Sequence, residues 1–285
     1  MPQNTGKSRN MLIAAMCIFG TIGIVRRFIP LSSSLIALVR GVVGAAFLLL
    51  ILLLQRKKLD KVAIRKNLGL LIASGIAIGF NWILLFEAYN YTSVATATLC
   101  YYLAPILVIL AAPIVLKESL TLRKAICTAV AFGGMILVSG VTEGGIQGAK
   151  GILFGLGAAV LYASVILMNK KFSAVDAYSK TILQLVFASL SLVPYVLLTE
   201  DWSQVVITGP SAILLLTAGV IHTGFAYCMY FGSMGELKAH TVALFSYIDP
   251  ILAIFLSVVL LKEPMSIPSV IGAVMILGAA YVSEK

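Results

Sequence analysis

The chain has 285 residues, of which 60% are hydrophobic and only 11% are charged, and its formal net charge is +10. Soluble domains carry about a quarter charged residues, so this composition excludes a soluble globular protein. Repeated apolar stretches of about twenty residues indicate an all-α integral membrane protein instead. The basic residues gather in short loops between these stretches. We interpret them as determinants of membrane orientation and expect no nucleic-acid partner.

Ten apolar segments, separated by Gly, Pro and charged residues, follow one another along the chain. Each is expected to cross the bilayer as a helix, because lipid offers no partners for backbone N–H and C=O groups. The first segment follows two basic residues as a signal peptide would, but no small-residue cleavage site comes after it, so it is predicted to be a span. The ten predicted spans are 11–29, 33–54, 68–88, 94–116, 123–141, 150–168, 181–199, 211–233, 240–261 and 267–283.

The Lys and Arg residues are distributed unevenly between the two sides of the predicted bundle. If the N-terminus is cytoplasmic, 16 of the 21 fall on the cytoplasmic side, four fall on the outer side, and Arg40 lies inside the second span. Because cytoplasmic loops carry an excess of Lys and Arg, this distribution predicts that both termini are cytoplasmic. We therefore expect a multi-pass protein of the cell (inner) membrane.

Two similar sequences occur in corresponding parts of the chain. The run YYLAPIL that begins at Tyr101 matches the run SYIDPIL that begins at Ser246, and eight of nineteen residues over Tyr101–Ser119 are identical at an offset of 145. Near the start of each half, residues 14–28 and 158–172 align at an offset of 144. These matches predict an internal repeat.

The repeat divides the ten spans into two units of five, residues 1–145 and 146–285. Because five is odd, the second unit enters the membrane from the opposite side, which makes the repeat inverted. Inverted repeats are typical of secondary transporters, whose substrate site lies near the bilayer midplane between the repeats. A duplicated channel or a duplicated structural bundle would share this pattern.

Three features together resemble a known family. They are the five-plus-five arrangement, a span that reads Y-x-x-P-I-L and ends in L-K-E, and the run LSSSLIALVR that leads into the second span. Over essentially its whole length the chain resembles the drug/metabolite transporter superfamily, EamA type. This resemblance implies a solute carrier whose central cavity is lined mainly by spans 3, 4, 8 and 9 and closed by spans 1 and 6.

Asp249 lies near the middle of span 9, where inserting a charged side chain costs about 2.5–3.5 kcal/mol. Its counterpart in the first half is Ala104, so the shared scaffold does not require a carboxylate there. The next residue, Pro250, lacks an N–H and is expected to bend the span. We predict that Asp249 binds a substrate cation or a proton. A protonated or tyrosine-bonded structural carboxylate is the alternative.

The other candidates for substrate binding are polar and aromatic residues of spans 3, 4, 8 and 9. His222, in span 8, is a candidate for protonation or substrate contact, or a hydrogen-bonding strut. Aromatic rings deep in the spans could stack on a flat or cationic solute, whereas Tyr89 and Tyr91 are expected in the interfacial belt. The predicted substrate-binding set is Asn81, Trp82, Tyr101, Tyr102, His222, Tyr227, Tyr230, Ser246, Tyr247 and Asp249.

Other charged residues lie toward the ends of spans. Arg40 is in the outer half of span 2 and Glu87 is at the outer end of span 3, so we predict a charge pair that gates the outer side. Arg40 could instead attract an anionic substrate group or extend its guanidinium to the membrane interface. Lys262 and Glu263, at the end of span 9, are interpreted as interfacial anchors. Glycines four residues apart, as at Gly75 and Gly79, predict close contact between helices.

These features favour a secondary active or facilitative transporter of small metabolites such as amino acids, working by alternating access at a central cavity. An organic cation, drug or amine transporter is the alternative, and a channel or a non-catalytic membrane subunit is a different class. No enzyme is expected, because the chain has no ordered Ser-His-Asp set. The four cysteines lack metal-ligand spacing, so neither a metal nor a cofactor is predicted. The expected partners are a small solute, protons as a candidate coupling ion, and the lipid bilayer.

Overall fold

The protein is described by a computed structural model that covers residues 5–56, 59, 61–115, 121–138, 148–172, 175–234, 245–246 and 248–284. Among these residues, seven helices are long and apolar enough to cross a membrane, and three shorter apolar helices accompany them. The all-α fold with ten apolar segments that the sequence predicts is therefore confirmed. Most of the first third of the predicted ninth span, together with Tyr247, lies outside the described residues.

In the first half, the first span is divided at Thr21, a break that the sequence does not predict. The fourth span is also divided, at Tyr102 and Leu103, just before Pro105. Pro105 thus occupies the first turn of the following helix, where its missing N–H has no helical partner to lose. The helices are α1 (Thr5–Gly20), α2 (Ile22–Arg27), α3 (Ser33–Leu54), α4 (Lys61–Lys66), α5 (Leu68–Tyr91), α6 (Val94–Tyr101), α7 (Ala104–Val115) and α8 (Leu122–Val138).

In the second half, the eighth span contains a π-helical segment between two α-helices. Pro250 lies in the first turn of the helix that follows the undescribed residues, as Pro105 does in the first half. The helices are α9 (Ala149–Asn169), α10 (Ala177–Thr199), α11 (Gly209–Gly219), the π-helix η2 (Val220–Phe225), α12 (Ala226–Met234), α14 (Ile248–Leu260) and α15 (Ile267–Glu284).

Short polar residues begin several of these helices. Ser32 accepts a hydrogen bond from a backbone N–H of α3, Ser93 does so for α6, and Asp176 does so for α10. Thr208 and Ser211 form a reciprocal capping box at the start of α11. Such side chains satisfy backbone donors that have no partner inside the helix, so the sequence defines where these spans begin.

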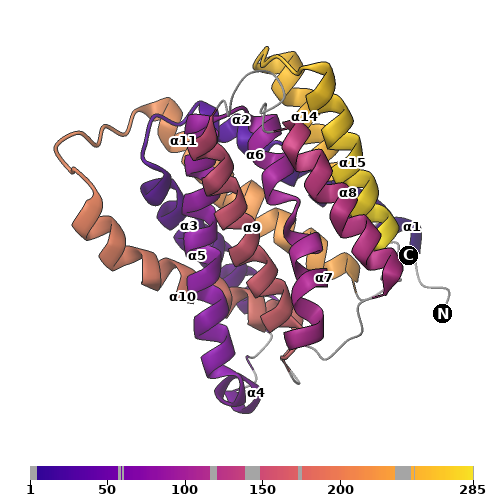
Figure 1. The fold of residues 1–285 in the computed structure, drawn as a ribbon. Helices are drawn as coiled ribbons and strands as arrows, with labels where there is room; N and C mark the ends of the chain where they lie inside the picture. The colour runs from indigo at the N-terminus through magenta and orange to yellow at the C-terminus, as the bar shows by residue number, and fades with distance from the viewer. Residues whose placement is uncertain are drawn as a thin grey trace.

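The contacts between helices follow the repeat: the larger contacts between two spans recur between their counterparts in the other half. α5, the third span, packs on α9, the sixth, and the corresponding contact joins α12, in the eighth span, to α1, in the first. Likewise α6 and α7 pack on α9, as α14 packs on α1. The contacts of α3 with α10 and of α8 with α15 join a span to its own counterpart, and Figure 1 shows α8 beside α15 at one side of the bundle. This pattern is the one expected of two repeats.

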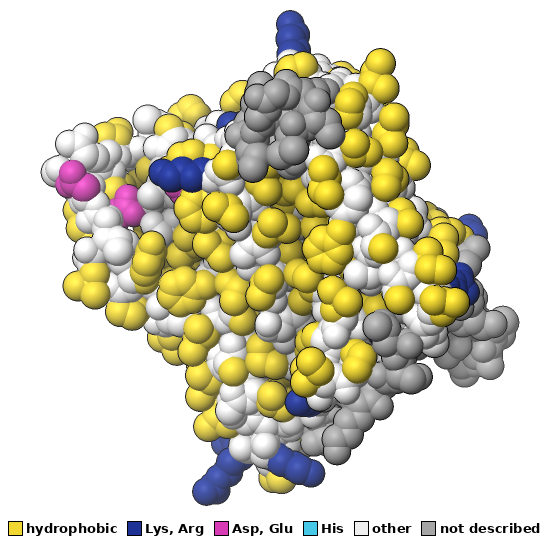
Figure 2. Space-filling view, viewed as in Figure 1, with side chains coloured by type: hydrophobic (Ala, Val, Ile, Leu, Met, Phe, Trp, Pro, Cys, Tyr) yellow, Lys and Arg dark blue, Asp and Glu magenta, His cyan; other side chains and the backbone are white. Residues whose placement is uncertain are grey.

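Large hydrophobic side chains cover much of the outer surface. Ile114 and Leu198 are each 85% exposed, and many other Leu, Ile and Val side chains are more than half exposed. Figure 2 shows hydrophobic side chains across the middle of the visible face, with Lys and Arg mostly toward its upper and lower ends. An apolar belt between charged ends matches a surface that faces lipid.

Gly75 and Gly79 bring α5 into close contact with α10, as the sequence predicts. A Cβ atom at Gly75 would lie 2.5 Å from Phe187 Cβ and 2.8 Å from the backbone oxygen of Gln184. A Cβ atom at Gly79 would lie 3.1 Å from the backbone oxygen of Ala188. Because two of these neighbours are backbone atoms, side-chain rotation cannot make room.

We expect Gly75→Ala to lower the temperature of thermal unfolding in detergent, since overpacking typically costs about 1–3 kcal/mol. Gly69→Ala is the matched control, because Gly69 lies in the same helix with nothing within 4 Å of its added Cβ. Alanine there favours the helix by about 1 kcal/mol, so that variant should be as stable as the parent or slightly more stable. An equal loss of stability in both variants would contradict a role for close helix contact.

Candidate functional site

A cavity of about 270 Å³ lies inside the bundle, and residues from both halves line it. The family resemblance implicates spans 3, 4, 8 and 9, with spans 1 and 6 closing the cavity. All six contribute, together with Arg40 of span 2. The cavity volume of about 270 Å³ lies just below the range of about 300–1,000 Å³ that is usual for ligand pockets. It matches a small metabolite in size.

Seven members of the predicted substrate-binding set line this cavity: Trp82, Tyr101, Tyr102, Tyr227, Tyr230, Ser246 and Asp249. The structure adds aromatic residues that the prediction missed. Tyr162 of α9 stacks on Tyr101 with ring centroids 5.0 Å apart, and Phe19 of α1 lies 5.4 Å from Tyr227. Both missed residues are mid-span aromatics of spans 1 and 6, the two spans that the resemblance places at the cavity, and this position could have identified them.

Arg40 is buried in the wall of the cavity and is 5% exposed. Its Nε donates to Thr223 Oγ1 at 3.0 Å, and Thr223 in turn donates to the backbone oxygen of Ala218 at 2.9 Å. Its guanidinium carbon lies 4.4 Å from the centroid of the Trp82 ring and 5.3 Å from that of Phe86. A planar cation held by aromatic faces and one hydrogen bond is well placed to receive an anionic group.

The predicted pairing of Arg40 with Glu87 is not formed in this structure. Glu87 accepts hydrogen bonds from Ser33 at 2.7 Å and from Asn90 at 3.1 Å. Ser33 precedes Arg40 by seven residues of α3, a rise of about 10 Å, which places Glu87 nearer the end of the bundle than the guanidinium. The two charged side chains therefore lie at different depths.

Asp249 brings a carboxylate to the same cavity. Its Oδ2 accepts a hydrogen bond from the Tyr102 hydroxyl at 2.7 Å, and Tyr102 lies at the break between α6 and α7. A Cβ atom at Gly20 would lie 2.8 Å from the backbone oxygen of Asp249, so α1 packs closely beside it. The only ion pair among the described residues is Arg27–Glu263, so Asp249 has no cationic partner among them.

His222 and Asn81 are absent from the cavity lining and instead join helices. His222 Nε2 lies 2.9 Å from Thr21 Oγ1, at the break in the first span, and Nδ1 lies 3.2 Å from the backbone oxygen of Thr217. Asn81 donates to the backbone oxygen of Ala158 at 2.6 Å, which links α5 to α9. The structure places both side chains as struts between spans, the alternative that the sequence left open for His222.

The location predicted for Tyr89 from the sequence is wrong. The sequence predicts Tyr89 in the interfacial belt, but it is 3% exposed and lines the cavity. Tyr91 is 42% exposed, stacks on Phe154 and lies 4.8 Å from Lys150 Nζ, as an interfacial residue would. The two tyrosines point to nearly opposite sides of α5, because an advance of two residues turns the side chain by about 200°.

The π-helix η2 and the end of α11, which precedes it, form the contact between the eighth span and α3. A Cβ atom at Gly44 would lie 2.5 Å from Thr223 Cγ2, and one at Gly219 would lie 2.5 Å from Val43 Cβ. This close packing keeps Thr223 against Arg40. Short π-helical segments are frequent at functional sites, and this one adjoins the cavity wall. Within the described ranges, no three His, Cys, Asp or Glu side chains gather as a metal site would require.

Comparison with known proteins gives a consistent set of relatives. The model of the EamA-like transporter family matches residues 10–140 and 149–284. The chain is 28% identical over 271 residues to the uncharacterized transporter YxxF of Bacillus subtilis, covering 93% of this chain and 85% of that protein. It is 29% identical over 213 residues to protein RarD of Salmonella typhi, covering 73% and 69%. A solved structure titled "Crystal structure of protein" matches with a TM-score of 0.64 at 19% identity, covering 98% of both chains, and so shares the fold.

Proposed function

The chain belongs to the EamA-like transporter family, and from this premise we propose that it carries small zwitterionic metabolites, amino acids above all, across the cell membrane. It is a multi-pass membrane transporter and not an enzyme. The proposed mode is alternating access, in which the units 1–145 and 146–285 move relative to one another around the central cavity.

One observation carries the choice of substrate: Arg40 and Asp249 line the same cavity, and no ion pair joins them. A zwitterion would bring its carboxylate to the Arg40 guanidinium and its ammonium group to the Asp249 carboxylate. Charge-assisted hydrogen bonds of this kind are stronger than neutral ones. They would also neutralise two charges of the cavity wall, of which Arg40 is buried and costly when left without a partner.

Cavity size and wall chemistry support a small metabolite. At about 270 Å³, the cavity lies just below the range of about 300–1,000 Å³ that is usual for drug-sized ligands. Trp82, Tyr101, Tyr227 and Tyr230 supply aromatic faces for the apolar part of such a solute, and Ser246 supplies a hydroxyl. In this proposal Asn81 and His222 hold the spans in place and do not contact the solute.

An organic cation or amine is the second candidate, because Tyr102 bonds to the Asp249 carboxylate and other tyrosines line the same cavity. Arg40 in the same cavity would repel such a cation. Counterflow in proteoliposomes, using α-amino acids and the primary amines that they give on decarboxylation, separates the two. Saturable counterflow of the amino acids, with weak competition by the amines, supports the proposal. Counterflow of the amines alone overturns it, and flux without saturation indicates a channel.

The proposed orientation places both termini in the cytoplasm, since Lys and Arg predominate on that side. We expect a reporter fused after the C-terminus, and one inserted in the loop that precedes α4, to show cytoplasmic activity. A reporter inserted in the loop between α10 and α11 should show outer activity instead. A cytoplasmic signal from that third position would contradict the orientation.

A further inference from the structure

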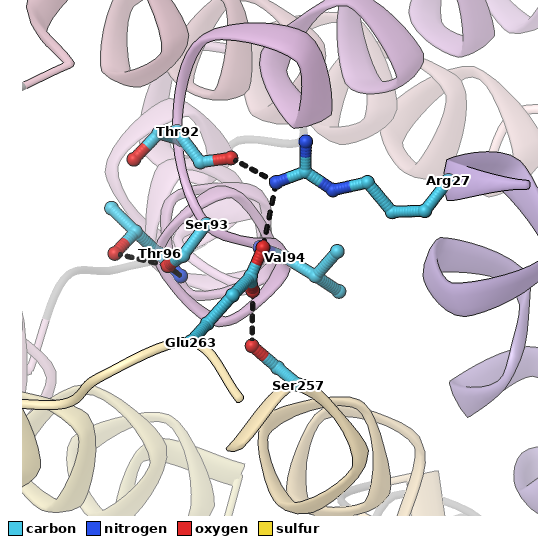
Figure 3. Close-up of polar contacts among 7 residues, drawn as sticks. All are labelled: Arg27, Thr92, Ser93, Val94, Thr96, Ser257 and Glu263. Carbon is cyan, nitrogen blue, oxygen red and sulfur yellow. Dashed lines mark hydrogen bonds and ion pairs between the residues drawn. The ribbon is translucent and has the colours of Figure 1, made fainter. Parts of the chain in front are cut away.

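Glu263 joins three spans at one end of the bundle (Figure 3). Its Oε1 accepts from Arg27 Nη2 at 2.6 Å, and its Oε2 accepts from the backbone N–H of Val94 at 2.8 Å and from the Ser257 hydroxyl. Arg27 also donates to the backbone oxygen of Thr92 at 2.9 Å. The interpretation of Glu263 as a simple interfacial anchor is therefore incomplete, because its carboxylate connects α2, α6 and the end of α14.

These contacts lie next to the cavity, one helical turn beyond residues that line it. Four residues of an α-helix rise about 6 Å, one turn. Each partner of Glu263 lies four residues from a cavity-lining residue of its own helix: Arg27 from Gly23 in α2, Val94 from Thr98 in α6, and Ser257 from Ala253 in α14.

Close packing of α2 on α6 makes this layer tight. A Cβ atom at Gly23 would lie 2.6 Å from Val94 Cγ1, so the two helices touch between the cavity and the carboxylate. α6 does not need Glu263 to begin, because Ser93 already caps it by accepting from the backbone N–H of Thr96 at 2.9 Å. The bond from Val94 to Glu263 thus acts between spans.

We propose that Glu263 is a gating residue of the transport cycle, which latches α2 and α6 to α14 and closes the outer end of the cavity. This inference rests on the alternating-access mechanism proposed above. The side chains of Arg27 and Glu263 are 31% and 16% exposed, so water can replace their contacts when the latch opens. A fully buried pair would leave uncompensated charges on opening and would resist the movement.

The test measures access to the cavity without any substrate. A single cysteine replaces Ala253 in a chain whose four native cysteines are changed to alanine, and a charged, membrane-impermeant thiol reagent is added to right-side-out or to inverted vesicles. In right-side-out vesicles, Glu263→Gln should raise the labelling rate by about tenfold, because the closed state loses charge-assisted hydrogen bonds. Arg27→Gln should raise it less, since Val94 and Ser257 keep their acceptor. Arg27→Lys should label at nearly the parental rate.

Glu200→Gln is the matched control. Glu200 also accepts hydrogen bonds from serines, Ser32 at 2.5 Å and Ser34 at 3.2 Å, but no hydrogen bond between described residues joins these two serines to α2, α6 or α14. This variant should label at the parental rate. An equal rise in the Glu200 variant, or no rise with Glu263→Gln in either type of vesicle, overturns the latch.

Two further readouts keep the outcome unambiguous. If Glu263→Gln does not give a monodisperse protein in detergent, Arg27→Gln decides, and parental labelling of that variant overturns the latch. A rise confined to inverted vesicles overturns the assignment of the latch to the outer side. Because no substrate is present, the labelling result stands whichever solute proves to be carried, and a failed latch leaves the counterflow test of the zwitterion untouched.

Discussion

Asp249→Asn is expected to reduce substrate accumulation to near background while the protein still folds. The asparagine Oδ1 can accept the hydrogen bond that Tyr102 donates to the carboxylate at 2.7 Å, so the contact between α14 and the break after α6 is kept. The substrate ammonium group, or a coupled proton, loses its charged partner. Loss of a hydrogen bond to a charged group costs about 1.5–3 kcal/mol, which corresponds to a decrease of about 10- to 100-fold in transport at low substrate concentration.

Uptake of radiolabelled substrate into proteoliposomes, recorded over a range of pH, checks this prediction. Asp249→Ala, which copies Ala104 of the first repeat, should behave like the asparagine variant. Asp201→Asn is the control carboxylate, since Asp201 is exposed and its side chain accepts hydrogen bonds from Ser203 of the same loop, with no other partner among the described residues. If Asp249→Asn transports at the parental rate with the parental pH profile, Asp249 is a structural hydrogen-bond acceptor and has no part in transport.

Arg40→Gln is expected to separate recognition of amino acids from recognition of amines. Removal of the guanidinium takes away the partner of the substrate carboxylate, so affinity for an amino acid should fall by about 10- to 100-fold. The corresponding primary amine should bind at least as well as before, because a repelling cation is gone. Folding should persist, since no described carboxylate is paired with Arg40 and none is left without its partner.

Arg40→Lys distinguishes charge from shape. Lysine keeps the positive charge but not the planar group that stacks 4.4 Å from the Trp82 ring centroid, so affinity for the amino acid should fall between those of the parent and the glutamine variant. Arg123→Gln, at an exposed position, is the control for loss of a cation. Equal losses for amino acid and amine in Arg40→Gln would show that Arg40 supports the cavity without recognising the carboxylate.

The spans could be predicted because they depend on local sequence. The predicted second span, 33–54, coincides with α3, since a serine cap begins it and charged residues end it. The break in the first span at Thr21 could not be predicted in this way, because the residues around it contain no proline. Contacts from other spans surround it: Gly20 packs on the backbone of Asp249, and His222 lies 2.9 Å from the Thr21 hydroxyl. Such contacts are invisible to a reading of one segment at a time.

The sequence predicts part of the cavity, because the helix period within a span decides which of its residues share a face. Trp82 and Asn81 are adjacent in α5, but one residue turns a helix by about 100°, so Trp82 faces the cavity and Asn81 faces α9. Tyr89 lies seven residues, or two turns, after Trp82 on the same face, and this spacing could have identified it. Arg40 bonds to Thr223, and Glu263 bonds to Arg27 and Val94. These partners come from spans distant in sequence, and no pattern within one span predicts them.

The π-helix in the eighth span lets that span absorb a change in its length. A π-helical turn accommodates one residue more than an α-helical turn does, so removing a single residue from Val220–Phe225 would restore a regular α-helix. α12 would keep its rotational phase, because the residue lost is the extra one that the π-helical turn accommodates. Tyr227 and Tyr230 would still face the cavity, whereas removing one residue from the regular helix α5 would rotate every later residue of that helix by about 100°. The eighth span should therefore tolerate the loss of one residue from this segment better than α5 tolerates the loss of one of its residues.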